Sequence, residues 1–139
     1  MEHSIFVDSN VFIGFLNEDD ALYKRALKLW DYLKKERYKV VVSNFIISEV
    51  VTVVSQRVDK KTAIEFAVTM YENEEQEVSI IRSDERIELK TLDYLRRITS
   101  KNVSFVDASI LAILDICHIQ KLASFDKVFQ KQKGIEILM

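Results

Sequence analysis

The stretch Ser4-Ile-Phe-Val-Asp-Ser-Asn10, near the start of the chain, decides the fold. Its apolar centre, residues 5–7, gives way abruptly to Asp8 and two further polar residues, a pattern typical of a buried strand that ends at a polar crevice. Open α/β sheets bind their ligands beyond the carboxyl ends of the strands. Asp8 is therefore a candidate site residue, and we expect other polar residues to converge on it.

Short apolar runs of the same kind recur along the chain, and segments with apolar residues at helical spacing separate them. Strands that alternate with helices predict a parallel sheet with right-handed crossovers and helices on both faces. We therefore predict an α/β fold, a single-domain α/β/α sandwich of residues 1–139 with a parallel, roughly five-stranded sheet. The predicted strands span residues 5–7, 39–43, 78–81, 122–124 and 135–138, and the predicted helices span residues 11–16, 21–37, 44–57, 60–73, 83–99 and 106–118.

The apolar faces of the helices predict how they pack. The helix over residues 106–118 is apolar almost all round, which predicts a central position. The helices over residues 60–73 and 83–99 are apolar along one face, which predicts one-sided packing on the core. The residues of these two faces are Ile64, Ala67, Val68, Tyr71, Ile87, Leu89, Leu92, Leu95 and Ile98.

The composition indicates one globular domain. Of the 139 residues, 48% are hydrophobic, which is enough for a sizeable core. The formal net charge of −2 excludes a whole-molecule basic surplus, so any nucleic-acid binding must be arranged locally. The acidic run over residues 72–77 is expected to be a solvated surface loop. The single cysteine, Cys117, has no partner for an internal disulfide, which suits a reducing cytoplasm.

Several classes of protein are excluded. No 18-residue apolar stretch and no signal-peptide core occur, so we expect neither export nor a membrane location. With only two glycines, the chain lacks the Gly-rich phosphate loops of nucleotide-binding proteins. Two histidines and one cysteine are too few for a usual structural zinc site.

Four acidic residues stand in mainly apolar sequence, whereas the other acids cluster in surface loops and on helix faces. They are Asp8, Glu49, Asp107 and Asp126. If they meet, two charges about 4 Å apart cost roughly 4 kcal/mol at an effective dielectric near 20, so the acids need a cation or must take up protons. Carboxylates without histidine or cysteine favour Mg²⁺ or Mn²⁺, and such a site suits the hydrolysis of a phosphodiester.

Most of these acids also have a purely structural interpretation. Asp8 and Asp107 could cap or complement helices, and Asp126 could serve a turn. Outside this set, we expect Asp115 to pair or be solvated at a helix surface. We expect His118 to cap or complement the end of the same helix.

Four motifs extend over the chain in a fixed order. They are Val7-Asp-Ser-Asn10, Ser43 followed by Glu49, Ser104-Phe-Val-Asp107 at the start of an apolar helix, and Ala123-Ser-Phe-Asp-Lys-Val-Phe129 before Gly134-Ile135. Together they resemble a PIN domain over nearly the whole chain. PIN domains are metal-dependent nucleases, and short single-domain members such as this one resemble the VapC toxins of VapBC toxin-antitoxin pairs, which are ribonucleases and usually dimers.

The resemblance implies a set of site residues. It makes Asp8, Glu49, Asp107 and Asp126 the catalytic acids of a site for Mg²⁺ or Mn²⁺, with Asp8 and Asp107 as the direct ligands. The partners that it implies are an RNA substrate, a VapB-like antitoxin and a second copy of the chain in a homodimer.

Two polar residues match supporting positions of the family. Asn10 and Ser124 stand where PIN domains orient the carboxylates or a bound water. The departures from the family pattern are small: Asn44-Phe45 stands where a proline is frequent, and serine occupies position 124 where threonine is common. Neither departure removes a ligand.

A different class of function stays open, a PIN-like module that binds RNA or protein without cutting it. Retention of all four acids favours the enzyme. A receiver-like phosphoacceptor would have an Asp ending its third strand, yet that strand ends in Ile80-Ile81-Arg82. A phosphatase of the haloacid dehalogenase type would have a second Asp where Asn10 stands. The sequence leaves open which RNA is cut and whether one metal ion or two are bound.

Overall fold

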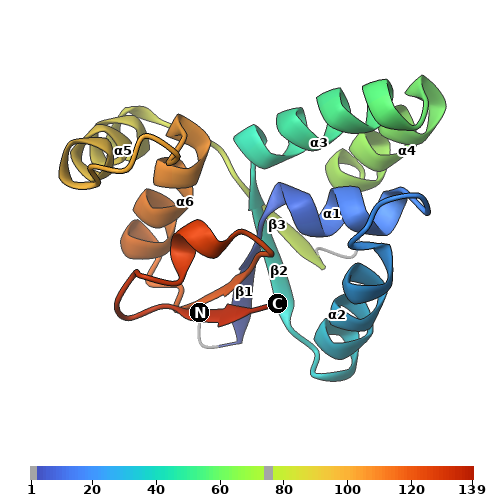
Figure 1. The fold of residues 1–139 in the computed structure, drawn as a ribbon, viewed down its shortest axis with the longest axis horizontal. Coiled ribbons are helices and arrows are strands. Elements are labelled where there is room, and N and C mark those ends of the chain that lie inside the picture. Colours follow the sequence, from blue (N-terminus) through green and yellow to red (C-terminus); the bar gives the residue numbers. More distant parts are fainter. Residues whose placement is uncertain (1–2, 74–76) are drawn as a thin grey trace.

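The computed structural model describes residues 3–73 and 77–139 and has a five-stranded parallel sheet at its centre (Figure 1). The strand order is β3-β2-β1-β4-β5, and every neighbouring pair is parallel. The predicted α/β fold with five parallel strands is therefore confirmed. The strands are β1 (Ser4–Val7), β2 (Lys39–Ser43), β3 (Val78–Ile81), β4 (Lys121–Ala123) and β5 (Glu136–Leu138).

The α-helices of the described residues form two groups, one on each side of the sheet. Figure 1 shows α1 to α4 on one side and α5 with α6 on the other. Helix α1 packs on α2 and α3, α3 packs on α4, and α5 packs on α6. The helices are α1 (Ser9–Leu16), α2 (Tyr23–Lys35), α3 (Asn44–Arg57), α4 (Lys60–Tyr71), α5 (Glu85–Arg97) and α6 (Phe105–Ile116), with a short 3-10 helix at Lys127–Phe129.

Strand β1 lies at the centre of both the sheet and the core. Phe6 has no exposed surface and pairs with Val41 of β2 on one side and with Leu122 of β4 on the other. Helix α6 buries residues 108–114 without a break, as its all-round apolar sequence predicted. Since each fully buried large apolar side chain contributes about 1.5–3 kcal/mol, the strand that precedes Asp8 is firmly held in the core.

Short connections bring several helix starts to one edge of the sheet. Helix α1 begins at Ser9, two residues after the end of β1, and α3 begins at Asn44 directly after β2. The hydroxyl of Ser43 accepts a hydrogen bond from the Ile46 amide at 3.3 Å and caps α3. Because the strands are parallel, their carboxyl ends share one edge, and the first turns of these helices meet there.

The packing faces predicted for α4 and α5 are wrong in part. Ile64, Val68 and Tyr71 of α4 and Leu89 and Leu92 of α5 are between 40% and 56% exposed. In α4 the buried side chains are instead Ala63, Phe66 and Met70. In α5, Ile87 is buried as predicted, and Thr91 is buried beside it. Apolar spacing therefore identified these segments as helices but did not identify which side of each helix meets the core.

The ends of some elements also differ from the prediction by one to two residues. Helix α2 starts only at Tyr23 because the Asp20 carboxylate accepts a hydrogen bond from the Leu22 amide at 2.8 Å and holds a turn there. It ends at Lys35, and Arg37 then takes a left-handed conformation with φ of 57°. Part of the acidic run over residues 72–77 lies outside the described residues. Within residues 3–73 and 77–139, no helix is long and apolar enough to cross a membrane.

Candidate functional site

A hydrogen-bonded polar network surrounds Asp8 at the carboxyl edge of the sheet. Val7 pairs with Ala123, so the residues that follow β1 and β4 lie side by side. The Asp8 side chain is buried, with 4% of its surface exposed. Its Oδ1 accepts a hydrogen bond from the Ser9 amide and its Oδ2 accepts one from the Ser124 hydroxyl, each at 2.7 Å. Both carboxylate oxygens are thereby fixed in direction.

Asn10 and Ser124 connect the start of α1 to the loop after β4. The Asn10 carbonyl oxygen accepts a hydrogen bond from the Phe125 amide at 3.1 Å, and its amide group donates to Ser124 Oγ and Asp8 Oδ2, each at 3.4 Å. Ser124 Oγ also accepts from the Asp126 amide at 3.1 Å. The structure thus brings both predicted supporting residues into contact with Asp8, whereas their part in a metal site stays a prediction.

Glu49 reaches the same network from α3. Its side chain is half-buried, and its Oε1 accepts a hydrogen bond from the Ser9 hydroxyl at 2.5 Å. Ser9 therefore lies between Asp8 and Glu49, which are 41 residues apart in the chain. The sequence analysis did not identify Ser9 as a site residue. The sequence signal that could have identified Ser9 is its position directly after Asp8, at the first residue of the capped helix.

Asp107 and Asp126 lie at helix starts next to this network. Asp107 is half-buried in the first turn of α6, where its Oδ2 accepts from the Ser104 amide while the Ser104 hydroxyl accepts from the Asp107 amide, both at 3.0 Å. This reciprocal pair is a capping box. Asp126 Oδ1 accepts from the Val128 amide at 3.0 Å and caps the 3-10 helix.

The capping or turn role that the sequence suggested for three of the aspartates is therefore confirmed. Asp8 caps α1, Asp107 belongs to the cap of α6, and Asp126 caps the turn after β4. Capping and a place in an acidic site do not exclude each other, because each carboxylate has two oxygens that accept hydrogen bonds or bind cations.

Electrostatic repulsion connects the four acids. Burial raises the pKa of Asp8 to about 6, and repulsion from Asp107 and Glu49 adds to the increase. Burial also raises the pKa of Asp107, with further increases from Asp126 and Glu49. Glu49, Asp107 and Asp126 thus each raise the pKa of another of the four acids, so the four lie in one local electric field.

The chemistry of these donors fits a hard divalent cation. All of them are carboxylate, hydroxyl or amide oxygens, which Mg²⁺ and Mn²⁺ prefer. Among the described residues, however, no three acidic, histidine or cysteine side chains are gathered closely enough to form a ready-made metal site. Mg²⁺ is usually held by only one or two carboxylates and keeps several waters, so the donor set fits this ion without a preformed cage.

Asp115 and His118 lie outside this site. The Asp115 carboxylate pairs with Lys90 Nζ at 3.1 Å and accepts a hydrogen bond from the Tyr94 hydroxyl at 3.2 Å, as expected for surface pairing. His118 is exposed in the turn after α6, with φ of 54°.

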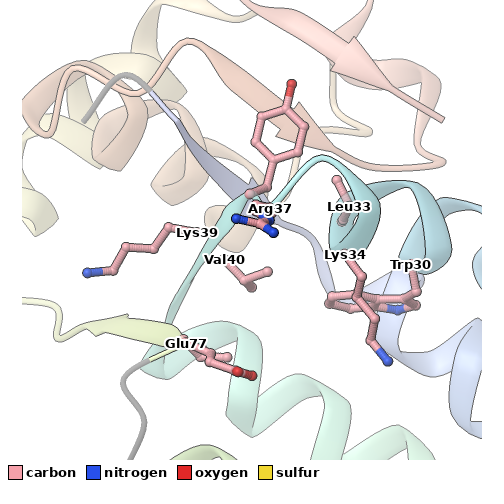
Figure 2. A pocket seen from close by; sticks show the side chains of 9 residues that line it. Trp30, Leu33, Lys34, Arg37, Lys39, Val40 and Glu77 are labelled. Atoms are coloured by element: carbon pink, nitrogen blue, oxygen red, sulfur yellow. The ribbon is translucent and has the colours of Figure 1, made fainter.

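A large cavity lies at the opposite edge of the sheet from the acids. It measures about 720 Å³ and opens between the end of α2 and the first residues of β2 and β3. Figure 2 shows Trp30 and Val40 on its walls, with Lys34, Arg37 and Lys39 nearby. The acids at the carboxyl edge are therefore not part of this cavity.

The fold and the network define a class, parallel α/β proteins with an acidic site where the central strand ends. The chain belongs to the PIN domain family, which it matches over residues 5–135. This range includes all four predicted acids and both supporting residues.

Two comparisons identify similar proteins. The chain is 26% identical to the 23S rRNA-specific endonuclease VapC20 of Mycobacterium tuberculosis, in strains CDC 1551 / Oshkosh and H37Rv, over 133 residues that cover 96% of this chain and 97% of the relative. The crystal structure of that protein, described as a sarcin-ricin loop cleaving toxin, matches with a TM-score of 0.80 over 91% of this chain and 93% of the other. A toxin-antitoxin complex from Klebsiella pneumoniae, 18% identical, matches in fold with a TM-score of 0.65 over 98% and 97% of the two chains.

The raised pKa of Asp8 predicts a specific dependence of stability on pH. The native pKa of about 6 exceeds the ordinary value of 3.8, so the native state binds more protons than the unfolded state between these values. The free energy of unfolding therefore falls as the pH rises from about 4 to about 6, by up to roughly 3 kcal/mol from this group. We expect Asp8→Asn to lack this decrease in the free energy of unfolding, as measured by urea unfolding in EDTA. Exposed Asp31→Asn serves as the control, and parallel pH curves for wild type and Asp8→Asn would contradict the prediction.

The contact between Ser9 and Glu49 predicts an energetic coupling. A hydrogen bond to a charged group contributes about 1.5–3 kcal/mol, so Ser9→Ala should lower the free energy of unfolding by about this amount. In a double-mutant cycle with Glu49→Ala, we expect a coupling energy of at least about 0.5 kcal/mol from urea unfolding. Purely additive effects of the two substitutions would mean that the hydrogen bond does not form in solution.

Proposed function

We propose that this PIN-domain protein is a metal-dependent endoribonuclease that hydrolyses RNA phosphodiesters with Mg²⁺ or Mn²⁺, and that it acts as the toxin of a toxin-antitoxin pair. The observation that carries the proposal is the buried carboxylate of Asp8, which lies in the field of Glu49 and Asp107 at the carboxyl end of the central strand. A buried and repelled carboxylate is costly unless a cation compensates it. The similarity to the endonuclease VapC20 supports the same proposal, a nuclease.

The proposed roles follow from the contacts of each residue. Asp8 and Asp107 are the direct metal ligands, and Glu49 and Asp126 complete the acidic site. Held by these acids, Mg²⁺ or Mn²⁺ would supply the Lewis-acid chemistry that phosphodiester hydrolysis needs. Above its pKa of about 6, Asp8 is ionised and available to a cation at neutral pH.

The neighbouring polar groups hold these acids in position. The Ser9 amide and the Ser124 hydroxyl orient the two oxygens of Asp8, and the Ser9 hydroxyl orients Glu49. Asn10 ties the loop after β4 to α1 through the Phe125 amide. Such outer contacts fix the direction of metal ligands and typically influence affinity by 10–100-fold.

The substrate that we propose is RNA. VapC20 is described as specific for 23S rRNA and as cleaving the sarcin-ricin loop. The RNA panel for the cleavage experiment should therefore include a structured stem-loop of this kind as well as unstructured RNA. We further propose a cytoplasmic location and one catalytic domain over residues 1–139.

The proposed partners are a VapB-like antitoxin and a second copy of the chain. The exposed apolar side chains of α5, Leu89 and Leu92, offer surface for a homodimer. An apolar groove of about 440 Å³ between α1, α2 and α4 offers a place for an apolar antitoxin segment. Phe12, Trp30 and Phe66 are among its lining residues.

A non-catalytic RNA- or protein-binding module is the second candidate. The observation in its favour is that no three metal-binding side chains are gathered into a site among the described residues. Metal binding that requires Asp8 and Asp107 would separate the enzyme from this alternative.

The decisive experiment is cleavage of a labelled RNA panel with Mg²⁺, Mn²⁺ or EDTA. We expect the wild-type protein to cut at least one RNA in the presence of metal only. Asp8→Asn and Asp107→Asn should each lower the rate at least about 100-fold, because each removes a negative charge from the metal site. Both variants should remain folded by circular dichroism.

Asp115→Asn is the matched control, because this aspartate pairs with Lys90 on the surface. It should cut at the wild-type rate. Cutting that persists in the Asp8→Asn preparation would indicate a contaminating ribonuclease. A folded wild-type protein that neither cuts RNA nor binds Mn²⁺ would contradict the proposal and favour the binding module.

The homodimer is tested by light scattering. We expect a dimer at micromolar concentration and a monomer after Leu89→Glu with Leu92→Glu, because both side chains are exposed in the single chain. Glu85→Lys on the same helix is the control for a change of charge alone. A wild-type protein that stays monomeric at high concentration would contradict the dimer.

A further inference from the structure

We propose that the exposed basic face of α2, together with the groove between α2 and β5, binds the single-stranded RNA that flanks the phosphate held at the acids. This inference rests on the proposed ribonuclease function. We call this surface the α2 groove, and its lining residues include Arg25, Lys28, Tyr32, Glu136 and Met139. It is about 430 Å³ in volume.

The charge of this part of the chain is the first argument. Residues 23–39 contain seven basic and two acidic side chains, a net charge of +5, whereas the whole chain has a net charge of −2. All seven basic residues are exposed. Arg25 and Lys28 line the α2 groove and Lys35 lies on the same face of the helix, whereas Lys34, Arg37 and Lys39 line the cavity at the opposite edge of the sheet. A local basic surface on an acidic protein is the arrangement that binding to a polyanion requires. The seven are Lys24, Arg25, Lys28, Lys34, Lys35, Arg37 and Lys39.

One contact joins the α2 groove to the loop beside the acidic site. The Arg25 guanidinium lies over the Phe125 ring, 4.8 Å from its centre. Phe125 in turn donates its amide hydrogen to Asn10 and directly follows Ser124, the residue that binds Asp8. This contact places the Arg25 end of the α2 groove beside the loop that holds Ser124 and Asp126, so the proposed RNA strand would run from the acids past this loop onto α2.

The spacing of residues along α2 gives the groove its direction. Arg25, Lys28, Tyr32 and Lys35 recur every three or four residues and so lie on one face of the helix. At 1.5 Å per residue this face extends about 15 Å from the edge that holds the acids. The adjoining face of α2, with Ala26, Leu29 and Leu33, is buried in the core.

An exposed aromatic side chain between the cations, Tyr32, favours RNA over an acidic protein. Tyr32 is 43% exposed, and its ring centre lies 6.3 Å from that of Tyr38. Tyr38 lines the other cavity and already stacks on His3 at 4.3 Å, so Tyr32 is the ring that the groove offers to a base. Single-stranded nucleic acids are bound by such combinations, because bases stack on the rings while phosphates meet the cations. An acidic peptide would use only the cations.

The test measures RNA binding in EDTA, because binding is then separated from metal-dependent cleavage. Fluorescence anisotropy would follow a labelled, unstructured RNA of about 20 nucleotides at about 50 to about 200 mM KCl. We expect Lys28→Gln with Lys35→Gln to weaken binding about tenfold at the lowest salt and to reduce the slope of log affinity against log salt by about 1.4. Tyr32→Leu should weaken binding but leave this slope unchanged, because it removes stacking and no charge.

Lys60→Gln with Lys61→Gln is the matched control, since it removes the same charge from the exposed first turn of α4. It should bind RNA like the wild type. Equal effects of the two lysine pairs, no effect of either, or no RNA binding by the wild type would overturn the proposal. Tighter binding of a labelled polyglutamate peptide than of RNA would also overturn it and assign the groove to an acidic protein.

The two functional tests can fail independently. RNA binding that depends on Lys28 and Lys35, without any cleavage, would support the α2 groove and contradict the proposed ribonuclease. Metal-dependent cleavage with equal KM and kcat in wild type and Lys28→Gln/Lys35→Gln would support the ribonuclease and contradict the groove.

Discussion

The site depends on one energetically unfavourable feature, a carboxylate buried where the central strand ends. Asp8 follows Ile5, Phe6 and Val7, which have no exposed surface, so the strand holds the carboxylate out of water. Burial raises its pKa, which means that the native state tolerates its charge at a cost. The packing of β1 between β2 and β4 supplies the stability that offsets this cost. Natural proteins retain such local destabilisation mainly at functional sites, because a ligand there relieves it.

Helix capping and the acidic site use the same residues. Asp8, Asp107 and Asp126 each accept hydrogen bonds at a helix start, which orients their carboxylates and stabilises the helices. Helix starts also carry partial positive charge, so they moderate the repulsion among the acids. Simple features of the fold assemble this acidic edge. Parallel strands end together, short connections follow them, and the starts of three helical segments place their acids close to one another.

Much of the fold was predictable because it follows from local pattern. The apolar runs gave all five strands, and β2, β3 and α3 begin and end where the sequence predicted. Alternation of strands and helices predicted the parallel sheet. The faces of α4 and α5 were not predictable, since Ile64 and Leu89 have the spacing of core residues yet are exposed. Which side of a helix packs depends on neighbours distant in the chain, and the spacing of one segment contains no information about them.

The sequence by itself determined the strands, the helices, the family resemblance and the identity of the four acids, because each of these depends on residue type and spacing along the chain. Only the tertiary structure decided how those acids are connected. The contact of Ser9 with Glu49 and that of Ser124 with Asp8 join residues 40 and 116 positions apart. The raised pKa of Asp8 depends on the exclusion of water by the surrounding core. The contact of Arg25 with Phe125 likewise exists only in three dimensions, because chain folding, and not sequence spacing, sets distances between elements.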